Sequence, residues 1–364
     1  MNESVRAVES GGASETVNRV LTLDAIRGIA IGLVLLRHAF PDTFGAGGFV
    51  GVELFFVLSG FLITGILVRD ATLQRLSLRR FYLNRALRLV PALVVVVVVV
   101  AVVASTAKPL NYQPDVFASL VTALTYTSDI PGWPLSQYRE LTHLWTLAIE
   151  EQFYLVWPFV IIWATKRYRS SITRFAYLGV VAGLVLLLLT AFVAFLRDVP
   201  SSIYTWPTTW TVTLLAGGAL AVSDKRQVVG AGVAWAALLG MIGISLLPDA
   251  KGHISSYVVV VPAVAIGATA LIANATGPNS ISILHFVPLQ QLGTISYGAY
   301  LWNYPIAQWV PGIWSMPLTI VAAVASYAVV EKQFLRMKRP APRAGDARPT
   351  GHLVALGAKQ EEGS

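Results

Sequence analysis

An arginine and a histidine that lie eleven residues apart, Arg27 and His38, are the residues best suited to chemistry by type and spacing. Eleven residues make about three helical turns, so the two side chains would share nearly the same helix face, about 16 Å apart along the axis. A histidine with an ordinary pKa of about 6.5 can take a proton from a hydroxyl group and release it again. An arginine keeps its proton and can donate to a phosphate or carbonyl oxygen. The two residues could therefore line one cavity, with His38 as a general base and Arg27 as a fixed donor.

Both residues also have a structural interpretation. His38 could cap a helix beside Pro41 and Asp42, and Arg27 could pair with Asp24, three residues earlier in the chain. Neither of these roles requires a reaction, and the spacing alone does not decide between the structural and the catalytic roles.

A second polar group comprises His143 and the adjacent carboxylates Glu150 and Glu151. In a helix, His143 and Glu150 would share a face, whereas Glu151 would point about 100° away. One carboxylate could orient a histidine or pair with an arginine, and the other could accept a hydrogen bond from a backbone or indole donor. The alternative is a structural ion pair with Arg85 or Arg88. These two arginines lie three residues apart, so they could fork onto phosphate oxygens or anchor the chain beside anionic lipid.

Three other positions are candidates for substrate binding. Glu53 is the one charge in the apolar stretch 48–63, where Gly60 and Ser59 are expected to serve helix packing. Tyr300 and Asn303 lie in an aromatic-rich stretch near the end of the chain, whose tyrosines would form one helical stripe. Such a stripe is usually packing or a membrane-interface belt.

The composition indicates an integral membrane protein. Of the 364 residues 55% are hydrophobic and 13% are charged, against a charged share of about 25% in soluble domains. The net charge of +8 comes with basic residues clustered in short segments between apolar runs, the pattern of cytoplasmic loops rather than of a nucleic-acid-binding face. Because cysteine is absent, thiolate metal sites, disulfides and an acyl-cysteine intermediate are excluded. We predict no metal cofactor and no nucleic-acid partner.

The apolar runs predict an all-α bundle of about ten transmembrane helices. Residues 69–88 carry six arginines against one aspartate and are predicted to be cytoplasmic. An even number of crossings then places both termini in the cytoplasm. Three domains are expected, namely a polar tail (1–20), a transmembrane domain (21–335) and a disordered cytoplasmic tail (336–364), and Val116 to Tyr126 could form an interfacial or re-entrant helix. The ten predicted helices lie near residues 21–40, 49–69, 89–107, 143–165, 174–196, 205–223, 228–247, 254–274, 290–310 and 313–335.

Four ordered motifs together resemble the acyltransferase-3 family of membrane O-acyltransferases. The resemblance spans residues 21–335. The matching segments are an Arg-x10-His signature at Arg27 and His38, a Gly-Val-x-x-Phe-Phe-Val-Leu-Ser-Gly-Phe-Leu segment at Gly51 to Leu62, a Phe-x-x-x-Arg-x-x-Arg-x-x-Pro segment at Phe81 to Pro91, and a His-x-Trp-x-Leu-x-x-Glu-x-Gln-Phe-Tyr block at His143 to Tyr154.

The resemblance implies an enzyme of a bacterial cell membrane that moves an acetyl or other short acyl group from acyl-coenzyme A to a hydroxyl. The acceptor would be a carbohydrate, a surface glycan or a secondary metabolite such as a macrolide, and membrane lipid would surround the enzyme. The implied roles are catalysis by His38, Arg27, Glu150 and Glu151, acyl-coenzyme A binding by Arg85 and Arg88, and substrate binding by His143, Glu53, Tyr300 and Asn303.

The chain departs from the family pattern at Asn84, where an arginine is common, at Asn303, where a histidine often follows Tyr-Leu-Trp, and at Gln333. We interpret Asn303 as a mark of acceptor preference. Two other functions use the same polar residues without chemistry. A transporter or flippase would carry a lipid-linked or glycosylated substrate through the cavity, and a scaffold would use the charges only to hold helices together.

Overall fold

The structure is a computed structural model that describes residues 3–107, 116–130, 139–168, 170–223, 229–248 and 250–338, and the regular elements among these residues are all helical. A short 3-10 helix (Arg139–Leu144) precedes α5, and π-helical turns at Ser256–Val260 and Tyr327–Glu331 adjoin α9 and α12. The α-helices are α1 (Glu3–Ala39), α2 (Gly47–Thr72), α3 (Leu78–Ala107), α4 (Val116–Leu124), α5 (Trp145–Arg167), α6 (Ile172–Leu196), α7 (Pro207–Ala221), α8 (Ala231–Ser245), α9 (Val261–Ala275), α10 (Val287–Thr294), α11 (Ser296–Trp309), α12 (Ser315–Ser326) and α13 (Lys332–Arg336).

Each of the ten apolar stretches predicted from the sequence contains a helix, but the boundaries differ in instructive ways. α3 begins at Leu78 because the basic segment before the apolar run is also helical. The stretch 290–310 is divided between α10 and α11, which meet at Ile295. Six helical segments of the described chain are long and apolar enough to span a membrane. The number ten and the cytoplasmic position of the termini stay predictions, as do the domain limits, and the tail from residue 339 lies outside the described residues.

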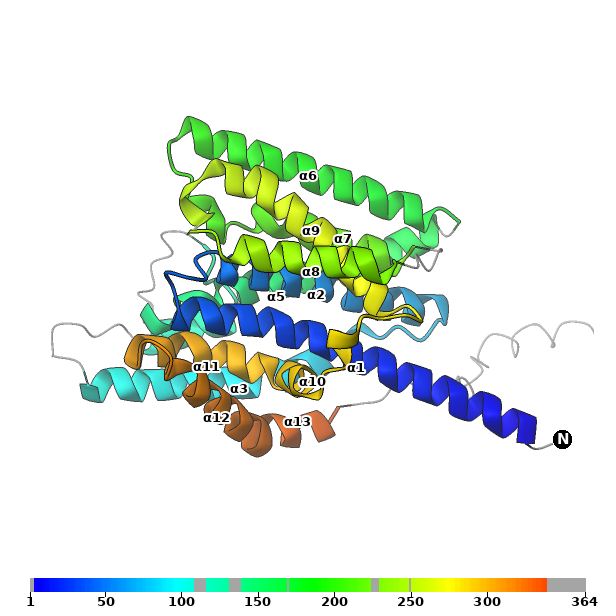
Figure 1. Ribbon diagram of the computed structural model, residues 1–364, viewed down its shortest axis with the longest axis horizontal. Helices are drawn as coiled ribbons and strands as arrows, with labels where there is room; N and C mark the ends of the chain where they lie inside the picture. Colours follow the sequence, from blue (N-terminus) through cyan, green and yellow to red (C-terminus); the bar gives the residue numbers. More distant parts are fainter. Residues whose placement is uncertain are drawn as a thin grey trace, which may run out of the picture.

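The helices run roughly side by side along the longest axis of the molecule, with α6 on one flank and α12 and α13 on the other (Figure 1). α1 extends beyond the bundle at its N-terminal end. α2 contacts α1, α5, α7, α8 and α9, which explains why its sequence is apolar on nearly every face. It is the central helix around which the others pack.

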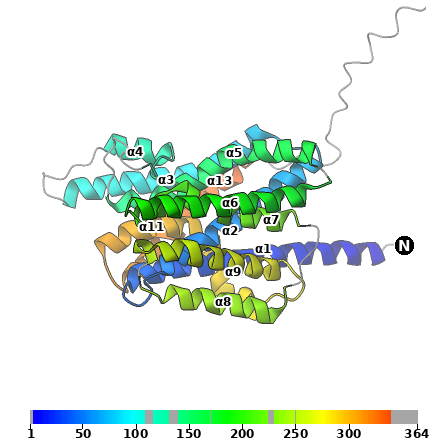
Figure 2. The same ribbon diagram turned by 90° about the horizontal axis from the view of Figure 1, so that it is seen from above.

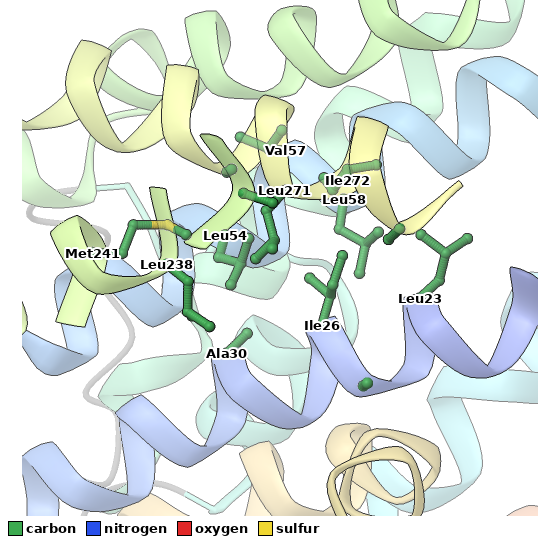
Figure 3. Close-up of a cluster of buried hydrophobic side chains, with 14 of the residues drawn as sticks. Leu23, Ile26, Ala30, Leu54, Val57, Leu58, Leu238, Met241, Leu271 and Ile272 are labelled. Carbon is green, nitrogen blue, oxygen red and sulfur yellow. The ribbon is translucent and has the colours of Figure 1, made fainter. Parts of the chain in front are cut away.

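The largest part of the core lies where α1, α2, α8 and α9 meet (Figure 3). Ile26 of α1, Leu54 and Leu58 of α2, and Leu271 of α9 are at most 1% exposed. These branched side chains fill the space between the helices and fix α1 against α2, the two helices that carry much of the site described below.

α2 and α7 approach so closely that their backbones touch. A Cβ atom at Gly60 would lie 1.9 Å from the carbonyl oxygen of Leu214, and one at Gly217 would lie 1.9 Å from the carbonyl oxygen of Val57. No side chain fits at either position, so the packing role expected of Gly60 is confirmed.

Substituting Gly217 with valine should therefore lower the free energy of unfolding by about 1–3 kcal/mol, because the added carbons force α7 away from α2. Thermal unfolding of the detergent-purified protein would show this as a lower melting temperature. The control is Gly232→Val in α8, where a Cβ has no neighbour within 4 Å. Equal melting temperatures for the two variants would contradict the proposed close contact.

α4 is a short helix that packs along α3, as Figure 2 shows, and the chain then turns towards α5. The side-chain amide of Gln152 in α5 donates at 2.9 Å to the carbonyl oxygen of Tyr126 and at 2.9 Å to the carboxylate of Asp129. Tyr126 has a φ of 53°, so the turn holds a non-glycine residue in the left-handed region. The turn after α4 is thereby attached to α5, and the interfacial or re-entrant character of this segment stays a prediction.

Asp70, which is buried near the end of α2, holds the connection between α2 and α3. It forms ion pairs with Arg80 at 3.1 Å, with Arg69 at 3.4 Å and with Arg75 at 3.7 Å. Three cations on one carboxylate fix the start of α3 and thereby the direction in which its arginines enter the bundle.

Candidate active site

Two adjoining cavities lie inside the bundle. The histidine cavity, of about 510 Å³, opens on His38, His143 and Asn303. The arginine cavity, of about 230 Å³, opens on Arg85 and Arg88. Further residues of the histidine cavity are Arg37, Phe49, Trp145, Tyr204, Lys251 and Tyr304. Further residues of the arginine cavity are Arg27, Phe55, Ser59, Glu150, Tyr154 and Tyr297.

Arg27 and His38 lie on the same helix, α1, but line different cavities. The spacing predicted one cavity for both residues, but the structure has two. Three helical turns separate the two side chains, so each lines a different cavity. Arg27 is paired with Asp24 at 2.7 Å, as the structural alternative anticipated, while it still lines the arginine cavity.

His38 is oriented by an amide from the far end of the sequence. Its Nδ1 lies 2.5 Å from Oδ1 of Asn303 in α11, 265 residues later. With the amide oxygen facing the ring, that oxygen can only accept, so Nδ1 carries the proton and Nε2 keeps a free lone pair. This is the tautomer that a general base needs.

The ring of Tyr304 contacts both histidines. It meets His38 edge-on at 5.3 Å between ring centroids and stacks on His143 at 5.2 Å. His143 also lies 5.3 Å from the ring of Tyr300. Three aromatic contacts therefore hold the imidazoles of this cavity in fixed positions.

Neither adjacent carboxylate contacts a histidine, which corrects the expectation that Glu150 or Glu151 orients one. Glu150 accepts hydrogen bonds from the hydroxyl of Tyr154 at 2.5 Å and from that of Ser59 in the arginine cavity. Glu151 forms an ion pair with Arg85 through two hydrogen bonds. The ion-pair alternative is confirmed for Glu151, and Ser59, expected only to pack, is a polar member of the site.

Arg88 is the uncommitted cation of the arginine cavity. Arg85 is occupied by a carboxylate and Arg27 is occupied by Asp24, but no described carboxylate lies within ion-pair distance of Arg88, whose side chain is exposed to the cavity. Lys338, just beyond α13, lies near enough for burial and the charge of Arg88 to lower its pKa to about 8. Glu150 and Glu331 also lie near enough to interact with the charge of Arg88. Arg88 is still the guanidinium of this cavity without a carboxylate at ion-pair distance among the described residues, so it can bind an anion such as a phosphate.

Glu53 stands apart from the other predicted substrate-binding residues. His143, Tyr300 and Asn303 all line the histidine cavity, whereas Glu53 lines neither cavity. Its side chain is fully buried, and its two carboxylate oxygens have no hydrogen-bond partner among the described residues. Eight of the ten predicted site residues thus line one of the two cavities, Glu151 is attached to the arginine cavity through Arg85, and Glu53 is left out.

Residues 20–330 match a family model described as an acyltransferase domain. The chain belongs to this acyltransferase family. The resemblance to the acyltransferase-3 family is thereby confirmed, and the apolar helices together with the family make the chain a multi-pass cell-membrane protein.

Curated relatives of this acyltransferase include O-acetyltransferases of three bacteria. The peptidoglycan O-acetyltransferase OatA of Listeria monocytogenes is 32% identical over 90% of this chain and 56% of its own length. The O-acetyltransferase OatA of Staphylococcus aureus is 30% identical over 79% of this chain and 50% of its own length. The putative peptidoglycan O-acetyltransferase YrhL of Bacillus subtilis is 30% identical over 85% and 54%. The chain spans about half the length of these relatives, and no solved structure matches it.

Several site residues of the acyltransferase carry no signal in the sequence. Val52 is an apolar residue of the Gly51 to Leu62 motif and Thr146 stands at a variable position of the His143 to Tyr154 block, yet both line the cavities. Lys251 comes from a connection that reads as a charge-balanced loop, and its ammonium lies 4.3 Å from the ring of Tyr204. Only the packing of distant helices brings these side chains to the site.

Proposed function

We propose that this chain is a membrane-embedded O-acyltransferase that moves a short acyl group, most simply acetyl, from acyl-coenzyme A to a hydroxyl of a glycan. The observation that carries the proposal is the contact of His38 Nδ1 with Oδ1 of Asn303, in a cavity that adjoins one lined by Arg27, Arg85 and Arg88. The relatives are named as O-acetyltransferases, two of them as established or putative peptidoglycan O-acetyltransferases, and this supports a glycan acceptor and an acetyl donor.

In this mechanism the donor occupies the arginine cavity. Arg88 and the neighbouring cations bind phosphate oxygens of coenzyme A, and Arg85 keeps its place through Glu151. Arg27 is about three helical turns from His38, so it acts on the donor and not on the atom that His38 deprotonates. The thioester then points towards the histidine cavity.

The acceptor hydroxyl enters the histidine cavity and meets Nε2 of His38. The ring takes the hydroxyl proton while the oxygen attacks the thioester carbonyl carbon, giving a tetrahedral intermediate. The carbon–sulfur bond breaks, the coenzyme A thiolate leaves, and the proton on His38 returns to that sulfur or to water. The products are the acylated hydroxyl and free coenzyme A.

The sides of the membrane follow from the loop charges. The arginine-rich segment 69–88 is predicted to be cytoplasmic, and the arginine cavity is lined by residues at the start of the following helix. Donor entry from the cytoplasm and acceptor entry from the opposite side are therefore part of the proposal. The polyanionic donor would never have to cross the membrane.

The proposal is tested with the purified protein in liposomes, labelled acetyl-coenzyme A, and two acceptors, a soluble peptidoglycan fragment and a glycosylated macrolide. We expect coenzyme A release that depends on the glycan acceptor, with a product heavier by one acetyl group, and no loss of activity on adding EDTA. Acylation of the macrolide alone would change the acceptor class. Acceptor movement without any coenzyme A release would favour a transporter and overturn the proposal.

A further inference from the structure

The histidine and arginine cavities meet at three side chains. Val52 of α2, Thr146 of α5 and Tyr300 of α11 line both cavities, and no other described residue does so. A group that reaches from one cavity into the other therefore passes between these three side chains. We call this set the partition.

Hydrogen bonds hold the partition in one arrangement. The hydroxyl of Tyr300 donates to the carbonyl oxygen of His143 at 2.6 Å. The hydroxyl of Thr146 lies 2.5 Å from the hydroxyl of Tyr300 and 3.4 Å from the same carbonyl oxygen, so the two hydroxyls and this carbonyl form one hydrogen-bonded group. Both polar members are thus tied to each other and to the backbone of the 3-10 helix before α5. Val52, with one branched side chain that is 6% exposed, closes the third side.

The geometry of acyl transfer places the acyl substituent at this level. In the tetrahedral intermediate the attacking oxygen and the sulfur occupy two corners, and the oxyanion and the acyl chain occupy the other two. If the attacking oxygen comes from the histidine cavity and the sulfur lies in the arginine cavity, the acyl chain extends sideways between them. It then presses against Val52, Thr146 or Tyr300.

We propose that the partition selects acetyl over longer acyl groups, with Val52 and Thr146 as specificity-determining residues. This inference rests on the proposed acyl transfer and adds the residues that limit the length of the acyl group. A methyl group fits beside side chains fixed by hydrogen bonds, whereas each further methylene must displace one of them.

The experiment compares kcat/KM for acetyl-, propionyl- and butyryl-coenzyme A with a single glycan acceptor. Val52→Ala removes two methyl groups from the partition, and the ratio of propionyl to acetyl turnover should rise by about tenfold, the usual value of one methylene in a shaped pocket. Val57→Ala is the matched control, since Val57 lies on the same helix, is fully buried and lines neither cavity. It should leave the ratio unchanged.

Thr146→Ser is the second variant, because it removes one methyl group while keeping the hydroxyl and its hydrogen bond to Tyr300. It should raise the same ratio even if Val52→Ala folds poorly. The inference is overturned if a folded Val52→Ala or Thr146→Ser protein keeps the wild-type ratio, or if Val57→Ala changes it equally. Absence of turnover in the wild-type protein with every acyl donor is a different result, which contradicts the proposed function itself.

Discussion

Replacing His38 with glutamine should lower kcat for acyl transfer by about 10²–10⁴-fold, the usual contribution of a positioned general base. Glutamine keeps a polar side chain that can still hydrogen-bond Asn303, so the fold is expected to survive. What it cannot do is take the proton of the acceptor hydroxyl. The measurement is coenzyme A release under saturating donor, together with the melting temperature of each purified variant.

The matched control is His285→Gln. His285 is exposed, bonds among the described residues to the hydroxyl of Ser280 at 2.8 Å, and lines neither cavity. Its substitution should leave kcat at the wild-type value. A His38→Gln protein with undiminished kcat, or a His285→Gln protein with an equal loss, would remove His38 from the mechanism.

The partner of His38 illustrates what the sequence could not supply. Periodicity relates residues within one helix, and it correctly placed Glu150 and Glu151 on different faces of α5, towards Ser59 and towards Arg85. It carries no information about contacts between helices that lie hundreds of residues apart. The Asn303 side chain, interpreted from the sequence as a mark of acceptor preference, contacts the proposed base across the bundle, and its part in acceptor preference stays a prediction.

The helices themselves were largely predictable because burial in a membrane demands long apolar runs. The prediction of helix boundaries was weakest in segments where burial in a membrane does not require an apolar sequence. The basic start of α3 is polar enough to read as a loop, and the break between α10 and α11 leaves the apolar composition of the stretch unchanged. The two cavities could not be predicted either. Val52 and Thr146 are residue types that also occur in the core, and only the folded structure shows that they line cavities.

Arg85 and Arg88 look equivalent in the sequence, but their surroundings in the structure differ. Arg85 is bound to Glu151, and its guanidinium lies 3.6 Å from the ring centroid of Tyr154. Arg85→Gln would leave the Glu151 carboxylate enclosed without a partner, so the free energy of unfolding should fall by about 3 kcal/mol. Arg88→Gln breaks no ion pair among the described residues and should leave the melting temperature unchanged.

For the binding of acyl-coenzyme A, Arg88→Gln should have a larger effect than Arg85→Gln. Loss of one charged hydrogen bond to a phosphate costs about 1.5 kcal/mol, so Arg88→Gln should raise KM for acyl-coenzyme A by about tenfold while kcat changes little. The double variant Arg85→Gln/Glu151→Gln separates the two arginines further. Removing both charges should restore most of the stability lost in Arg85→Gln, because no unpaired charge stays enclosed. If Arg88→Gln destabilised the fold as much as Arg85→Gln and left KM unchanged, both arginines would be structural and the donor would have to bind elsewhere.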